Sequence, residues 1–175
     1  YKDESINSSV SLKRKIQIVD TTGPKLQLVG DQNITTEVGF SYTDQGAIWT
    51  DAIDGNGTIS SIGIINVQSP GTYLLNYFYT DQAGNAGQPF PLSRMVTVKD
   101  TLGPSIVFPQ KEFPPFIIGQ EIVITGIVAV DLFDGDITSS LQISYPVGFD
   151  ANKTGSYLVN FSVTDSSGNL TSINK

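Results

Sequence analysis

Paired aspartates are the residues of this chain whose type and spacing could do chemistry. Asp51 and Asp54 precede a glycine, and Asp131 and Asp134 repeat the same Asp-x-x-Asp-Gly pattern. Two carboxylates can hydrolyse a glycosidic bond, but these pairs occupy turn sequences with few aromatic residues to line a cleft. The chain contains no His and no Cys, which excludes Ser-His-Asp and Cys-His catalysis together with zinc, haem and iron–sulfur sites. We therefore expect no enzymatic activity.

These aspartates belong to a sequence repeat. Residues 20–26 (DTTGPKL) return as residues 100–106 (DTLGPSI), a spacing of 80 residues. Residues 71–85 return as residues 155–169, a spacing of 84 that reflects a few inserted loop residues. Self-similarity at such a period indicates consecutive structural repeats of one kind.

The N-terminal segment matches the end of a repeat, because residues 12–20 resemble residues 92–100. We therefore expect residues 1–19 to be the last strand of a repeat whose beginning is missing. The predicted parts are this segment and two domains, at residues 20–99 and 100–175.

Alternating apolar and polar residues predict β-strands in both repeats. Every second residue from Tyr157 to Val163 is apolar, and the same holds from Tyr73 to Tyr79, without a competing helical pattern. Segments rich in β-branched and aromatic residues between Gly, Pro, Asn and Asp clusters indicate an all-β sandwich of two antiparallel sheets. Tyr73 and Tyr157 suit either a tyrosine corner or the core, and we expect the single Trp49 in the core.

The order of the motifs is specific. Asp-Thr-x-Gly-Pro is followed by Asp-x-x-Asp-Gly, by Gly-x-Tyr before a strand ending in Thr-Asp-x-x-Gly-Asn, and by Arg-x-Val-x-Val-x-Asp. This order resembles the Ig-like surface repeats of bacteria and their hyalin-repeat relatives over essentially the whole chain. The resemblance implies tandem Ig-like β-sandwich domains, similar in outline to cadherins, that serve as spacers and adhesive modules of secreted or surface-anchored proteins.

The two repeats differ before the strand that contains Trp49. The first repeat has Tyr42-Thr43-Asp44-Gln45-Gly46, whereas the second has Ile124-Thr125-Gly126 at this place. We expect the two domains to differ here in an edge-strand bulge.

Acidic residues of each repeat are expected to converge at one end of the sandwich. In an Ig topology the B–C and F–G loops lie at the end where the preceding segment enters. The candidate metal ligands there are Asp20, Asp51, Asp54 and Asp81 in the first repeat and Asp100, Asp131, Asp134 and Asp165 in the second, with Asp136 nearby. Convergent carboxylates on irregular loops suit Ca²⁺, which would stiffen the array. The alternative is that these aspartates only cap turns by accepting backbone N–H groups.

Asn-x-Ser/Thr sequons are more frequent than the Asn, Ser and Thr content gives by chance. The six glycosylation candidates are Asn7, Asn33, Asn56, Asn152, Asn160 and Asn169. Their expected places in loops, at strand edges and on an outward strand face suit a bulky glycan, and N-glycosylation would imply a secretory route. The alternative is that a Ser- and Thr-rich β surface contains sequons without modification.

The second domain is expected to lack its own strand G, because no Arg-x-Val-x-Val segment follows Asn169. Such a sandwich exposes an apolar groove and unpaired backbone groups. The N-terminal segment offers a surplus strand, whose interface residues are Leu12, Arg14, Ile16 and Ile18. Two explanations stay open. The strand of one copy docks into the next by donor-strand complementation and builds a head-to-tail homopolymer, or the sequence is part of a longer array of neighbouring Ig repeats.

The charge of the chain excludes further partners. Ten Lys and Arg against 17 Asp and Glu give a net charge of −7, which repels nucleic acid and anionic membrane surfaces. No apolar run is long enough to span a membrane, and the first residues are not a signal peptide. We expect an extracellular or cell-surface repeat of a fibre, pilus-like filament or adhesin stalk, with surface glycans as a further partner. The alternative is a spacer or carbohydrate-binding accessory module of a secreted polysaccharide-active enzyme.

Overall fold

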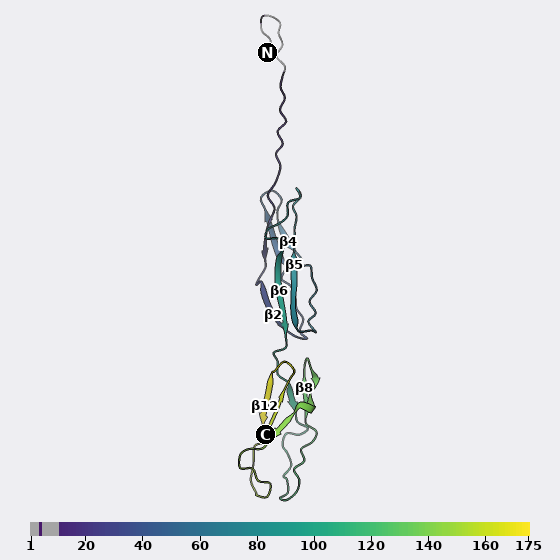
Figure 1. The fold of residues 1–175 in the computed structure, drawn as a ribbon, viewed down its shortest axis with the longest axis vertical. Coiled ribbons are helices and arrows are strands. Elements are labelled where there is room, and N and C mark those ends of the chain that lie inside the picture. The colour runs from purple at the N-terminus through teal and green to yellow at the C-terminus, as the bar shows by residue number, and fades with distance from the viewer. Residues whose placement is uncertain (1–3, 5–10) are drawn as a thin grey trace. The chain divides into compact units, whose positions relative to one another are not determined.

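The computed structural model describes residue 4 and residues 11–175 of the chain (Figure 1). It comprises two compact units: unit 1 contains the described residues up to Val29 with residues 46–60 and 77–92, and unit 2 contains residues 30–45, 61–76 and 93–175. Within the described residues twelve strands form four three-stranded sheets, with one short 3-10 helix and no α-helix. The predicted all-β class is confirmed.

Within this described part of the chain, no helix is both long and apolar enough to cross a membrane.

The sheet of unit 1 contains β1 (Lys25–Leu28), β3 (Ala47–Asp51) and β4 (Gly55–Ile59), paired antiparallel in the order β1-β3-β4. Successive side chains of β3 point to opposite faces, so Ala47 and Trp49 are buried while Ile48 is exposed. The Trp49 ring stacks on that of Tyr79, with the ring centroids 4.1 Å apart. The prediction that Trp49 lies in the core is confirmed.

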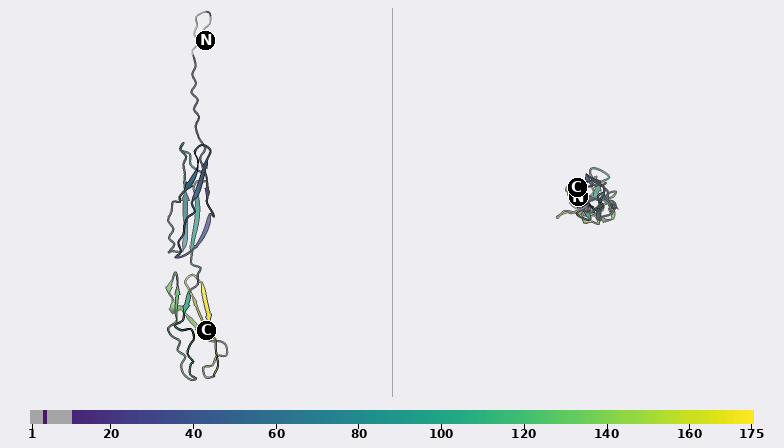
Figure 2. Two further views of the ribbon diagram at one scale, coloured as in Figure 1. Left: turned by 180° about the vertical axis from the view of Figure 1, so that it is seen from behind. Right: turned by 90° about the horizontal axis from the view of Figure 1, so that it is seen from above.

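A second sheet places β6 (Leu92–Lys99) between β2 (Asn33–Glu37) and β5 (Gly71–Tyr77), as Figures 1 and 2 show from both sides. Strand β2 runs parallel to β6, with Asn33 opposite Met95 and Glu37 opposite Lys99. Every second residue of β6 is buried, in the order Leu92, Arg94, Val96 and Val98. This alternation places an arginine on the apolar face of the strand.

In unit 2 the second repeat contains two further sheets. One consists of β7 (Ser105–Val107), β8 (Val128–Asp131) and β9 (Gly135–Asp136), and after η1 (Thr138–Ser140) the other consists of β10 (Gln142–Ser144), β11 (Asn160–Thr164) and β12 (Leu170–Asn174). The core between them joins Ile106, Ile127 and Ala129 to Phe161 and Val163. These two sheets form the predicted sandwich.

The two conserved-looking turns before strands β5 and β11 differ in their tyrosines. Tyr73 Oη donates a hydrogen bond to the backbone oxygen of Ser69 at 2.8 Å, which is the contact of a tyrosine corner. Tyr157 instead packs edge-on against Phe149, with ring centroids 5.0 Å apart. Each of the two interpretations of these tyrosines is therefore correct for one of them.

Two expectations about the terminal strands are wrong. Residues 11–24 form no strand, and Leu12, Ile16 and Ile18 are 90%, 85% and 93% exposed, because no described segment pairs with them. Conversely, β12 occupies the strand G position expected to be empty. It pairs with β11 from Leu170 to Asn174, and Lys175 adds two backbone hydrogen bonds to Val159 at 2.8 and 2.9 Å.

Arg94 is the buried cation of the first repeat, with 1% of its surface exposed. Its Nε donates to the backbone oxygen of Asp31 at 2.9 Å, and its Nη1 pairs with Oδ1 of Asp44. Tyr42 Oη donates to the same Asp44 oxygen at 3.4 Å. A guanidinium so far from water is tolerated only because the carboxylate and the carbonyl compensate its lost hydration.

Replacing Asp44 by Ala leaves the Arg94 guanidinium buried without its carboxylate. We expect the free energy of unfolding to fall by about 3 to 5 kcal/mol, measured by urea denaturation. Asp31→Ala is the matched control, since only the backbone oxygen of Asp31 accepts from Arg94. Equal losses for the two variants would contradict the assignment of Asp44 as the counter-ion.

Candidate metal centre

Each repeat builds an aspartate turn where a strand of its first sheet ends. Asp51 ends β3, and its Oδ1 accepts the backbone N–H groups two and three residues further on, at 2.7 and 3.0 Å. Asp131 ends β8 and makes the same two contacts at the same distances. Gly55 and Gly135 follow with φ of 94° and 73°, a conformation that favours glycine. The turn-capping role considered for these aspartates is therefore present.

The second aspartate of each pair faces another turn. Asp54 Oδ2 accepts the backbone N–H of Gln82 at 2.7 Å. Asp134 accepts both the backbone N–H and the hydroxyl of Ser166, each at 2.6 Å, and these bonds lower the pKa of Asp134. The prediction of Asp54 and Asp134 as metal ligands is not supported, because their oxygens point at the neighbouring turn and join neither carboxylate cluster.

A third aspartate and an asparagine close the turn after the following strand. Asp81 accepts the backbone N–H of Asn85 at 2.7 Å and its side-chain amide at 2.9 Å. Asp165 holds Asn169 in the same way, at 2.7 and 2.8 Å. Sequence reasoning missed this role of the asparagines, although the Thr-Asp-x-x-Gly-Asn motif contains both partners in each repeat.

The remaining aspartates come together in two clusters. Asp20, Asp51 and Asp81 each place a carboxylate oxygen within 4.8 Å of those of the other two. Asp100, Asp131 and Asp165 do the same in the second repeat. The expected convergence of the linker aspartate with the two loops is therefore found in both repeats. Six of the eight predicted metal ligands lie in these clusters.

Asp100 is the unusual member of its cluster. Its side chain is 8% exposed, and neither carboxylate oxygen has a hydrogen-bond partner among the described residues. Burial raises the pKa of Asp100, as do the negative charges of Asp131, Asp165 and Glu37, and the nearby Ser167 side chain offsets only part of this effect. Asp20, its counterpart, is half-buried and accepts the N–H of Thr22 at 3.0 Å.

Glu37 is a contact that the sequence did not reveal. This residue ends β2, and its carboxylate accepts the backbone N–H of Thr101 at 2.7 Å and the Thr101 hydroxyl at 2.6 Å. Partial burial raises the pKa of Glu37, but the bonds from Thr101 outweigh it and the net pKa is lowered. The segment after Asp100 is thereby tied to the end of β2.

The glycosylation candidates have different surroundings. Asn7 lies outside the described residues, whereas Asn33, Asn56 and Asn152 are exposed. The side-chain nitrogen of Asn160 donates to Ser172 Oγ at 2.8 Å and to Asn174 Oδ1 at 2.9 Å, and that of Asn169 is bound to Asp165. Because a glycan attaches to this nitrogen, the geometry favours modification at the exposed three over Asn160 and Asn169.

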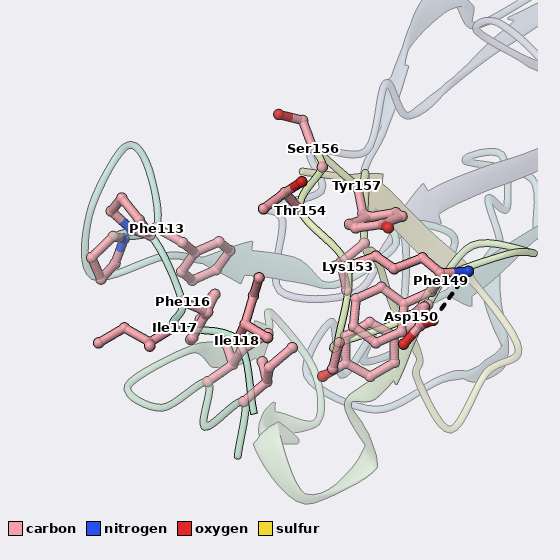
Figure 3. Close-up of a pocket in the computed structure, with 18 of the residues that line it drawn as sticks. Phe113, Phe116, Ile117, Ile118, Phe149, Asp150, Lys153, Thr154, Ser156 and Tyr157 are labelled. Atoms are coloured by element: carbon pink, nitrogen blue, oxygen red, sulfur yellow. Dashed lines mark ion pairs between the residues drawn. The ribbon is translucent and has the colours of Figure 1, made fainter. Parts of the chain in front are cut away.

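A cavity of about 510 Å³ lies in the second repeat, beside the end of β12. Figure 3 shows Phe113, Phe116, Ile117 and Ile118 on one side and Phe149 and Tyr157 on the other. These side chains belong to the counterparts of β2 and β5, which in the first repeat flank β6. The cavity therefore corresponds to the place that the second half of β6 fills in the first repeat.

Comparisons with known proteins agree with this fold. Residues 26–98 match the family described as bacterial surface protein, Ig-like domain. An uncharacterized 81.3 kDa protein of Acholeplasma phage L2 is 29% identical over 175 residues, which cover 92% of this chain and 23% of that protein. A crystal structure of a lipoprotein from Bacteroides thetaiotaomicron matches with 16% identity and a TM-score of 0.38, over 86% of this chain and 77% of the lipoprotein chain.

The family match confirms the resemblance to bacterial Ig-like surface repeats for the first repeat. Residues 26–98 are an Ig-like domain of the bacterial surface type. The chain spans only 23% of the length of the phage relative.

The hydrogen bonds to Asp134 make part of the stability depend on pH. Because its pKa is lowered on folding, this carboxylate stabilises the fold above its ordinary pKa near 3.9 and loses that contribution as the pH falls through the lowered value. We expect Asp134→Asn to reduce the urea midpoint at about pH 7 and to differ little from the parent chain at about pH 2. A gap between the two proteins that stays constant over this range would contradict the account.

Proposed function

We propose that this chain is a structural segment of a surface-displayed or extracellular protein, in which Ig-like repeats serve as a stalk, fibre or adhesin spacer. The observation that carries the proposal is the recurrence of the same loop contacts in both repeats. Asp51 and Asp131 cap one turn, and Asp81 and Asp165 close another with an asparagine. Such contacts hold loops in one conformation, which suits a load-bearing spacer. The surface-protein match of residues 26–98 supports the location.

The proposal makes a direct statement about where the protein is found. Antibodies raised against residues 20–175 should label intact cells or particles of the source, and external protease should remove the label. Lysis should add little to the signal. Labelling that requires lysis would contradict surface display.

The proposed partner is another β-strand of the same repeat type, because the cavity beside β12 has the shape of a vacant strand position. Lys175 corresponds to Arg94. Its Nζ donates to the backbone oxygen of Gln110 at 3.2 Å and lies 4.1 Å from the centre of the Phe108 ring. Ile124 stands where the first repeat has Asp44, so aromatic rings and a carbonyl replace the carboxylate as the partner of the cation.

This correspondence changes the expected mode of strand exchange. Residues 12–18 of a second copy would bring Arg14 to the position that Lys175 holds, and would displace the end of β12 from β11. We favour a strand in line with β12 that presents apolar residues at alternate positions, as Val96 and Val98 do in β6. Head-to-tail association through Leu12, Arg14, Ile16 and Ile18 remains the competing mode.

A chain extended after Lys175 by the sequence MVTVKD, copied from residues 95–100, tests this mode. Each valine that enters the cavity stabilises the fold by about 1.5 kcal/mol, so we expect the thermal midpoint of the second repeat to rise by about 10 °C. The control extension MDTDKD has the same length but would place aspartates in the cavity. Equal midpoints for the two extensions would contradict the proposed strand position, and a concentration-dependent dimer of the parent chain abolished by Ile16→Asp would show that a second copy fills it.

A further inference from the structure

The carboxylates of Asp100, Asp131 and Asp165 are held together at a cost. Their oxygens lie within 4.8 Å of one another, and all three side chains are buried. Like charges at this distance repel, and the repulsion grows as water is removed from around them. The hydrogen bonds to Asp131 and Asp165 satisfy those two aspartates individually, but Asp100 receives none.

Asp100 is the independent observation that points to a ligand. A turn-capping aspartate would accept backbone N–H groups, as Asp131 does through Oδ1. Both oxygens of Asp100 are instead buried without a partner, at the centre of a group of acceptors. Buried carboxylates are paired or coordinate a metal ion, because an isolated one loses its hydration without compensation.

We propose that Asp100, Asp131 and Asp165 bind one Ca²⁺ ion. Asp100 offers both oxygens, Asp131 offers the oxygen that the turn N–H groups leave available, and Asp165 offers lone pairs beyond its bonds to Asn169. Water molecules complete the six to eight oxygen ligands that Ca²⁺ takes. Three carboxylates against a divalent ion leave one negative charge, in place of three that repel one another.

The donor set selects the class of ion. All ligands are oxygens, and the chain has neither the His nor the Cys that zinc and copper prefer. Ca²⁺–oxygen distances of about 2.3 to 2.6 Å place ligands on opposite sides of the ion about 5 Å apart, in agreement with the 4.8 Å limit of the cluster. Mg²⁺ needs a tighter octahedron of about 2.1 Å, which irregular loops rarely provide.

The cluster of Asp20, Asp51 and Asp81 is a second and weaker site. Its geometry satisfies the same 4.8 Å limit, but Asp20 and Asp51 are only half-buried. Asp20 also accepts a backbone N–H at 3.0 Å, so one of its oxygens is already compensated. Both sites include the aspartate that precedes a repeat, so the ions would order the entry of each repeat. This inference does not depend on the surface role proposed above.

Calcium titration of the whole chain tests the proposal. After treatment with EDTA, isothermal calorimetry with CaCl₂ should show two sites of unequal affinity. A hundredfold excess of Ca²⁺ over the dissociation constant should raise the thermal midpoint of the second repeat by about 10 °C. Mg²⁺ at the same concentration should produce a much smaller shift. Absence of both heat and shift at millimolar Ca²⁺ would overturn the proposal, as would equal responses to the two ions.

Substitution of Asp100 separates ion binding from a purely structural role. Asp100→Asn should weaken the tighter site at least tenfold. In EDTA the same variant should melt above the parent chain, because a buried charge without a partner has been removed. Asp150→Asn removes the same charge outside both clusters and should change neither property. Asp165→Asn provides a second ligand variant if Asp100→Asn does not fold. Parental calcium affinity in a folded ligand variant would contradict the assignment.

Discussion

Carboxylates that accept backbone N–H groups beneath loops are the constraint on which the rest of this structure depends. Asp51 and Asp131 fix the turns between neighbouring strands of one sheet, and Asp81 and Asp165 fix the turns that follow β5 and β11. Burying an aspartate in this way is favourable only while every donor stays in place. The loops are therefore as well determined as the strands, and their convergence brings the acidic clusters together.

The two repeats show how one fold accommodates different buried cations. Arg94 pairs with Asp44 and a carbonyl, whereas Lys175 meets a carbonyl and the Phe108 ring, with Ile124 in the place of the aspartate. A guanidinium with several donors needs a carboxylate, but a single ammonium group can lie over an aromatic face. The difference between Tyr42–Gly46 and the matching segment of the second repeat, expected as a change of strand bulge, has this electrostatic consequence.

Motif spacing predicted the all-β class, the meeting of Asp20 with Asp51 and Asp81, and the core position of Trp49, because strand alternation and Ig topology determine them. It did not predict that Asp54 and Asp134 turn toward another loop, or that Glu37 binds Thr101, since these contacts depend on side-chain direction. Strand β12 was missed because its sequence, LTSIN, lacks the Arg-x-Val-x-Val pattern of β6. Pairing with β11 overrides the weak local pattern.

The exchange rates of the backbone N–H groups of Asn85 and Asn169 test this account most directly. Both groups lie in loops, where solvent exchange is ordinarily fast, but each donates to a buried aspartate at 2.7 Å. Hydrogen–deuterium exchange followed by NMR should find them protected to the same degree as the strand N–H groups of β6 and β11. Exchange as fast as in an exposed turn would show that the aspartates do not hold the loops.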